Sequence, residues 1–463
     1  MDLFRKKSIS AMMQQAQTGT ALKRTLGTWD LTLLGLGAII GTGIFVLTGT
    51  GAVTAGPGIM ISFLISGLAC ALTALCYAEF ATLVPVSGSV YTFAYATLGE
   101  LIAWIIGWDL ILEYLLAVSL VSAGWSGYLQ SLLQGLGISL PTALTAAHGA
   151  VPGVETWFNL PAFVVVIVIT FFVARGVKES ARVNNIMVLI KTAVVILFVI
   201  VGIGYVKPDN WHNFMPFGLE GVFSAAAITF TAFLGFDAVV AAAEETKNPA
   251  KDLPRGIMYS LFICILLYIV VSAIMTGIVP FAEFEGVAHP VSLALQYAGQ
   301  DWVAGFIDLG AIVGMLTVML VMLFGQTRIA FAMSRDGLLP SVFSKVHPKF
   351  QTPYRATWII GSVAALLGGI VPLDRLAEMI NIGTLTAFVL ISLGVIVLRK
   401  TQPELPRKFR TPAVPFVPLL SMAVCIFLMT NLSASTWYAF LIWLTIGLSI
   451  YFLYSRKRSH LNG

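Results

Sequence analysis

Residues 37–45 read GAIIGTGIF and lie inside an apolar run that otherwise has the composition of a membrane-spanning helix. Gly37, Gly41 and Gly43 fall within seven residues of one another. Each glycine costs about 1 kcal/mol relative to alanine in the interior of a helix. The stretch therefore predicts a helix that is interrupted near its middle.

The composition of the chain places such runs in a membrane. Of its 463 residues, 58% are hydrophobic and 11% are charged, and the mean hydropathy is +0.90. A soluble chain carries about 25% charged residues, and about 20 apolar residues are enough to cross the hydrocarbon core. The sequence predicts an all-α integral membrane protein whose first span also directs its insertion, without a removable signal peptide.

Twelve apolar segments fit the length of a transmembrane helix. The predicted spans are residues 29–53, 58–83, 101–120, 161–172, 186–206, 222–242, 256–279, 303–330, 358–370, 377–398, 415–429 and 437–454. With the N-terminus in the cytoplasm, 24 of the 27 lysine and arginine residues fall in cytoplasmic segments, as the positive-inside rule requires. We expect a multi-pass protein of the cell membrane with both termini cytoplasmic. The net charge of +5 then reflects topology and needs no nucleic-acid partner.

The sixth span carries a second interruption. Its residues 230–237 read FTAFLGFD, with Gly235 and the ionisable Asp237 inside an apolar run. Glycines in spans often serve helix packing, but spans one and six hold the same place in two successive groups of five. Glycine-interrupted spans at corresponding positions indicate a transporter built from inverted repeats. Irregular backbone within a membrane is tolerated only against protein or a water-filled cavity.

An interrupted helix exposes backbone N–H groups on one half and carbonyl groups on the other. The N–H groups suit a carboxylate, and the carbonyl groups suit an ammonium. A free α-amino acid carries both groups close together. The pattern therefore predicts an amino-acid site where the two interruptions meet.

Three motifs give the chain a family resemblance. They are GAIIGTGIF at 37–45, GFDAVVAAAEETKNPAKDLPRGI at 235–257 and AMSRDGLLPSVFSKVHPKFQTP at 332–353. Together they resemble the amino acid–polyamine–organocation superfamily, and the second and third resemble its cationic amino acid transporter branch in bacteria. The resemblance covers nearly the whole chain. It implies a five-plus-five inverted repeat with two extra helices, alternating access, and helices 1 and 6 unwound at mid-membrane.

The resemblance also implies how the chain divides and which residues bind the substrate. The expected parts are a cytoplasmic segment at 1–28, the first repeat at 29–206, the second repeat at 207–398, two additional spans at 399–455 and a cytoplasmic tail at 456–463. The implied substrate residues are Ile40, Gly41, Thr42 and Gly43 at the carboxylate, and Phe230, Thr231, Ala232, Phe233 and Gly235 at the amino group and side chain.

Ionisable residues inside spans are functional candidates. Glu113 shares a face of span three with Asp109, and both a structural hydrogen bond and a functional role stay open for it. Lys191 lies about six residues into span five, shallow enough to extend toward the membrane surface. Proton-coupled bacterial relatives carry a lysine at the matching place. The resemblance therefore implies proton coupling through Lys191, with Glu113 and Asp237 as further candidates.

Span eight carries Met319 and Met322 on one helical face. Methionine often fills a core, but a face turned toward the substrate would form an apolar pocket. A cationic head group there would lose its hydration without compensation. We therefore expect small neutral amino acids such as alanine to be accepted beside, or in preference to, the basic ones that the branch resemblance implies.

The favoured interpretation is a secondary active transporter that imports L-amino acids together with protons. An amino-acid exchanger of the same fold is the first alternative, and an amino-acid sensor without transport is the second. No cofactor, metal or enzymatic reaction is expected. The expected partners are the amino acid, protons and the lipid bilayer, and the sequence names no small membrane protein as a partner.

Overall fold

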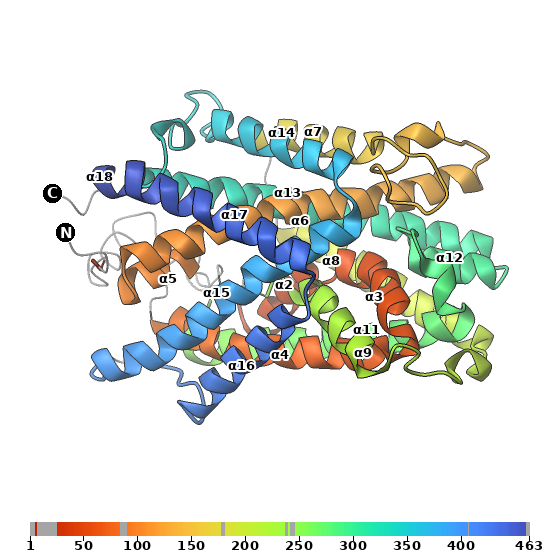
Figure 1. Ribbon diagram of the computed structural model, residues 1–463, viewed down its shortest axis with the longest axis horizontal. Coiled ribbons are helices and arrows are strands. Elements are labelled where there is room, and N and C mark those ends of the chain that lie inside the picture. Colours follow the sequence, from red (N-terminus) through yellow and green to blue (C-terminus); the bar gives the residue numbers. More distant parts are fainter. Residues whose placement is uncertain are drawn as a thin grey trace.

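The computed structural model describes residues 5–6, 26–83, 90–176, 181–236, 239–240, 246–405 and 407–459, and these residues are mostly helical (Figure 1). Short 3₁₀ or π segments carry the letter η. The elements are α2 (Thr28–Ile39), η1 (Gly43–Leu47), α3 (Thr48–Ala55), η2 (Gly56–Gly58), α4 (Ile59–Leu83), α5 (Val90–Thr97), α6 (Glu100–Gly135), η3 (Thr142–Leu144), α7 (Leu160–Ala174), α8 (Ala181–Gly202), η4 (Ile203–Tyr205), η5 (Pro208–Trp211), α9 (Gly218–Thr229), η6 (Phe230–Phe233), α11 (Pro249–Ile278), η8 (Phe281–Phe284), α12 (Pro290–Tyr297), α13 (Asp301–Arg335), η9 (Ser341–Phe343), α14 (Tyr354–Ile370), α15 (Leu373–Thr401), α16 (Phe416–Thr430), α17 (Ala434–Ile450), η10 (Tyr451–Ser455) and α18 (Arg456–Arg458).

Within the described chain, 7 helical stretches are long and apolar enough to cross a membrane, and five apolar helices of 10–17 residues accompany them. Every predicted span overlaps at least one of these segments. The predicted third span, residues 101–120, is too short, because α6 continues to Gly135. The continuation contains Ser122, Gly124 and Ser126, which are buried against protein. A helix surrounded by protein does not need the apolar surface by which a span is recognised.

The long helices run along one axis of the molecule (Figure 1). α6 packs against α13 at the centre, α14 lies beside α7 along one edge, and α4 lies with α11 and α9 along the opposite edge. The basic helix α18 marks one end of the molecule, and the short helix α12 marks the other. We call these the α18 end and the α12 end.

Buried Glu100 binds residues from both terminal regions at the α18 end. Its carboxylate accepts hydrogen bonds from Arg5 at 3.0 Å, from Tyr95 and Tyr451 at 3.0 Å, and from Ser459 at 2.5 Å. Arg5 belongs to the N-terminal segment, and Ser459 follows the last helix. The N-terminal and C-terminal segments therefore lie on the same side of the bundle.

The first helical interruption follows α2. Ile40 leaves the helical conformation (φ −70°, ψ 101°), and helical hydrogen bonding resumes in η1 and α3. At Gly43 a Cβ atom would lie 2.7 Å from the Cα of Ala232. Only glycine allows the two backbones to approach so closely.

The second interruption follows η6. Leu234 is extended (φ −63°, ψ 147°), and Gly235 has φ +111°, in the region that favours glycine. A Cβ atom at Gly235 would lie 2.7 Å from the carbonyl oxygen of Ala38. Each interruption therefore uses a glycine to contact the backbone of the other.

Candidate functional site

A cavity of about 40 Å³ lies where the two interruptions meet. Six of the predicted site residues line it: Gly41, Thr42, Gly43, Glu113, Thr231 and Met322. One water molecule needs about 10–15 Å³ of such volume. The cavity is therefore too small for an amino acid in this conformation; we call it the closed cavity, and an amino acid can enter only if the wall moves.

The other predicted substrate residues are buried but do not line this cavity: Ile40, Phe230, Ala232, Phe233, Gly235 and Met319. The ring of Phe230 packs edge-to-face against Phe388, and that of Phe233 packs against Tyr268. These aromatic contacts hold η6 in place behind the residues that line the cavity. The candidate Asp237 lies outside the described residues.

Lys191 of α8 holds the end of α2. Its Nζ donates a hydrogen bond to the carbonyl oxygen of Gly37 at 3.0 Å, and the residue is 2% exposed. Its stem lies against α13, where a Cβ atom on Gly314 would come within 2.9 Å of the Lys191 Cγ. Lys191 thus joins α2, α8 and α13, and in this conformation it does not extend toward the membrane surface.

Tyr268 of α11 connects the two interruptions. Its hydroxyl lies 2.9 Å from the carbonyl oxygen of Ile39 and 2.9 Å from that of Ala232. A hydroxyl carries one proton, so it donates to one of these carbonyls at a time. The ring packs against Phe233 and Phe63, with centroids 5.1 and 5.3 Å away. Tyr268 therefore holds the end of α2 beside η6.

Two further polar side chains bind carbonyls near the interruptions. Asn381 of α15 donates from Nδ2 to the Ile228 oxygen at 2.8 Å and accepts a hydrogen bond from Thr231. Tyr128 of α6 donates to the Phe45 oxygen. An unpaired buried carbonyl costs about 1–3 kcal/mol, so these donors offset the hydrogen bonds that the helices lose.

Sequence reasoning missed Tyr128, Tyr268 and Asn381. The signal available for each was a polar side chain inside an apolar run. That signal is weak, because a tyrosine or asparagine in a span also occurs as an ordinary packing residue or a helix-to-helix hydrogen bond.

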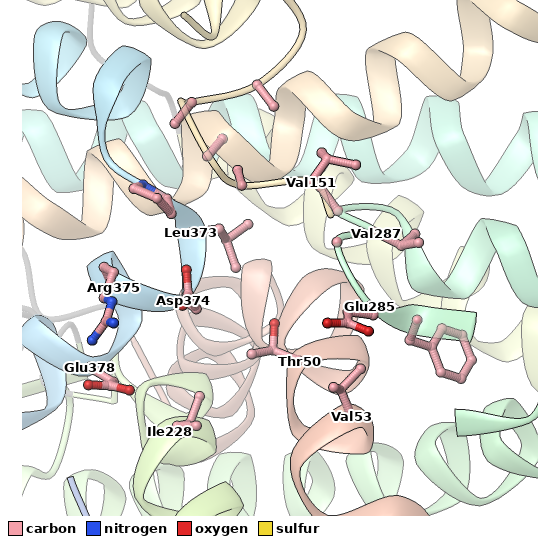
Figure 2. Close-up of a pocket in the computed structure, with 18 of the residues that line it drawn as sticks. Thr50, Val53, Val151, Ile228, Glu285, Val287, Leu373, Asp374, Arg375 and Glu378 are labelled. Carbon is pink, nitrogen blue, oxygen red and sulfur yellow. The ribbon is translucent and has the colours of Figure 1, made fainter. Parts of the chain in front are cut away.

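A second, larger cavity of about 960 Å³ lies at the α12 end; we call it the vestibule. Figure 2 shows Asp374 and Glu285 on opposite sides of it, with Thr50 of α3 between them. Glu220 and Glu378 also line it, whereas Arg375 is its one guanidinium among the described residues. Burial lowers the pKa of the vestibule residue His289 to about 4, so this ring is neutral at pH 7. The vestibule is therefore acidic.

About one helical turn separates the vestibule from the closed cavity. On α6, Leu120 lines the closed cavity and Ala123 lines the vestibule. Along the second interrupted helix, Thr231 lines the closed cavity and Ile228 lines the vestibule. Three residues of helix rise about 4.5 Å. A thin layer of side chains therefore closes the site on the vestibule side.

Comparison with known proteins decides the family. The family model for amino acid permeases matches residues 26–451. The chain belongs to the amino acid permease family. This permease is 67% identical over 460 residues to the branched-chain amino acid permease BcaP of Bacillus subtilis (strain 168), covering 99% of each chain. It is 56% identical over 461 residues to the methylthioribose transporter of the same strain, again covering 99% of each chain.

A eukaryotic relative is less similar to this permease. The vacuolar cationic amino acid transporter 4 of Arabidopsis thaliana is 37% identical over 410 residues, which cover 87% of this chain and 68% of the relative. The superfamily that the three motifs indicated is thereby confirmed. These relatives are named as permeases and transporters, and the two bacterial ones are more similar to this permease than the cationic transporter is.

Proposed function

We propose that this permease imports neutral L-amino acids across the cell membrane by proton-coupled symport. The observation that carries the proposal is the closed cavity between the two interrupted helices, with Lys191 bound to the Gly37 carbonyl beside it. Gly41 and Gly43 line this cavity, and on this proposal their backbone N–H groups bind the substrate carboxylate. A buried lysine that binds the end of α2 is placed to exchange a proton when the three helices move and this contact breaks.

The proposed topology has twelve spans in two inverted repeats and two additional helices, with helices 1 and 6 unwound at mid-membrane. The basic α18 end then faces the cytoplasm, as the positive-inside rule favours, and the α12 end faces outward. In this orientation a large vestibule opens outward above a closed binding cavity. Such an arrangement fits one stage of alternating access, in which the thin layer at Ala123 and Ile228 opens to admit substrate.

The cavity wall favours a neutral, apolar side chain. Leu120, Val121, Val318 and Met322 line the cavity opposite the interruptions, and Glu113 is the one carboxylate among its described lining residues. The name of the Bacillus subtilis relative gives branched-chain amino acids as its substrates, and those side chains match an apolar wall. We infer that aliphatic amino acids, alanine included, are preferred over arginine and lysine, whose cationic ends would lose hydration here.

Uptake into proteoliposomes tests this function. Labelled leucine, valine, alanine and arginine are offered under an inward proton gradient, under a sodium gradient, and without a gradient, with protein-free liposomes as the control. The proposal predicts accumulation of the aliphatic substrates under the proton gradient alone. Counterflow without accumulation would instead identify an exchanger. Stabilisation by amino acids without counterflow would identify a sensor.

A further inference from the structure

A second buried polar cluster joins α6, α12 and α13 on the α12 side of Lys191. Asp308 of α13 is 1% exposed, and its Oδ2 accepts a hydrogen bond from Ser131 of α6 at 2.8 Å. Ser131 also accepts a hydrogen bond from Gln296 Nε2 at 3.0 Å and lies 3.3 Å from the hydroxyl of Ser292. Gln296 and Ser292 both belong to α12. We call these four residues the Asp308 cluster.

Ser131 and Ser292 both stabilise the Asp308 carboxylate, but one of its two oxygens is less well satisfied than the other. Oδ1 is buried, and no hydrogen bond from the described part of the chain reaches it. A buried carboxylate oxygen without a partner is costly, and the cost falls when the group is neutral. Ionisable side chains within spans commonly mark ion and proton pathways. The free oxygen is therefore a place where a proton can bind.

The cluster lies next to the vestibule. Ala288, just before α12, and Gly127 of α6, one turn before Ser131, both line that cavity. The two residues touch, since a Cβ atom on Gly127 would lie 2.5 Å from the Cβ of Ala288. Neither Ser131 nor Ser292 lines the vestibule, so a proton that reaches Asp308 from there crosses the layer at Gly127 and Ala288, about one helical turn from Ser131.

Other titratable groups packed around the cluster are His289, Tyr128 and Lys191. Burial lowers the pKa of His289, at the start of α12, to about 4, so it stays neutral between about pH 5 and pH 8. Tyr128 of α6 is a phenol, which ordinarily ionises near pH 10. Lys191 of α8 packs two turns further along α13. Helix α7 carries no titratable side chain, and those of α14 in contact range of α13 lie at the α18 end.

We propose that Asp308 is a second proton-binding residue of the transport cycle, loaded from the vestibule. This inference rests on the proposed proton-coupled transport. The step is the addition of one proton to a carboxylate oxygen, and no other bond forms or breaks. As a carboxylate, Asp308 holds Ser131 through a charge-assisted hydrogen bond, about twice as strong as a neutral one. Protonation weakens this bond and loosens α12 from α6 and α13.

The variant Asp308→Asn tests the proposal, because asparagine has the size of the protonated acid and cannot ionise. Counterflow is measured in proteoliposomes across external pH from about 5 to 8. The exposed Asp301→Asn, in the first turn of the same helix, is the matched control. We expect the pH midpoint of counterflow in Asp308→Asn to differ from the midpoint that wild type and Asp301→Asn share, while the part of the pH dependence that belongs to Lys191 remains. A wild-type pH dependence in Asp308→Asn would overturn the proposal.

Infrared difference spectroscopy gives a second readout that does not need transport. Acidifying the purified wild type should produce the carbonyl band of a newly protonated carboxylic acid, and Asp308→Asn should lack that band. Ser131→Ala, which keeps the carboxylate, should shift the pH midpoint of the band. If the wild type fails to accumulate substrate on a proton gradient, the proposed function fails, whereas a band that persists in Asp308→Asn contradicts the role of Asp308.

Discussion

The two interrupted helices are held by different kinds of donor. At the first interruption, the ammonium group of Lys191 binds the Gly37 carbonyl. At the second, the neutral amide of Asn381 binds the Ile228 carbonyl. An amide does not titrate, whereas a lysine amine does. On the proposed mechanism, the first interruption therefore responds to a proton while the second keeps its donor at every pH.

The largest expected effect comes from a side chain that obstructs the close contact between the two interruptions. In Gly43→Val, the new side chain would collide with the backbone of Ala232, which lies 2.7 Å from the position of Cβ. We expect loss of amino-acid binding, measured as loss of thermal stabilisation by leucine or alanine. Gly305→Val is the matched control, because no atom lies within 4 Å of its Cβ position. Binding by Gly43→Val, or competition by amino-acid esters as strong as by the free acids, would disprove the carboxylate site.

A smaller effect is expected from the tyrosine that joins the interruptions. Tyr268→Phe removes a hydroxyl that serves the carbonyls of both Ile39 and Ala232, whereas Tyr128→Phe affects only that of Phe45. An unsatisfied buried carbonyl costs about 1–3 kcal/mol. We expect Tyr268→Phe to lower both the melting temperature and the substrate affinity more than Tyr128→Phe does. Equal losses of affinity in the two variants would show that substrate binding does not depend on the connection that Tyr268 makes between the interruptions.

The smallest effect is expected on the α13 wall of the cavity. Met322→Ser enlarges the cavity without touching either interruption, so it should shift uptake toward larger or basic side chains and leave the pH dependence unchanged. We expect the ratio of basic to aliphatic uptake to change by about threefold. A methylene group in a pocket is worth about 1–3 kcal/mol of discrimination, and the expected effect is smaller because methionine is flexible. The control is Met275→Ser, in which the lost thioether is buried on α11. An altered pH profile in Met322→Ser would show that specificity and coupling share one element.

The sequence predicted the places where the helices break, because the cause is local. Gly43 and Gly235 are visible as glycines in apolar runs, and both make the close backbone contacts that glycine alone permits. The sequence also indicated a family, which the match to residues 26–451 confirms. The apolar runs placed Glu113 and Met322 in spans, the family resemblance implied Thr231, and the structure brings all three to one cavity.

The remaining parts of the site depend on how distant helices pack, which the local pattern does not contain. Tyr268 is 229 residues from the Ile39 carbonyl that it binds, and Asn381 is 153 residues from Ile228. The length of α6 was beyond reach for a related reason: its second half is buried by protein rather than lipid, so hydropathy does not reveal it. The vestibule is likewise assembled from helices and loops that are far apart in the sequence.

The most direct test of a proton-responsive first interruption compares Lys191→Ala with Asn381→Ala. Both variants lose a side-chain donor to a carbonyl near an interruption, and accumulation is measured in proteoliposomes under an inward proton gradient across external pH. We predict that Lys191→Ala loses gradient-driven accumulation, and that Lys191→Arg, which stays charged, retains weak transport at most. Asn381→Ala should transport more slowly with the wild-type pH dependence. A Lys191→Ala variant that still concentrates substrate on a proton gradient would contradict the account and direct attention to Glu113.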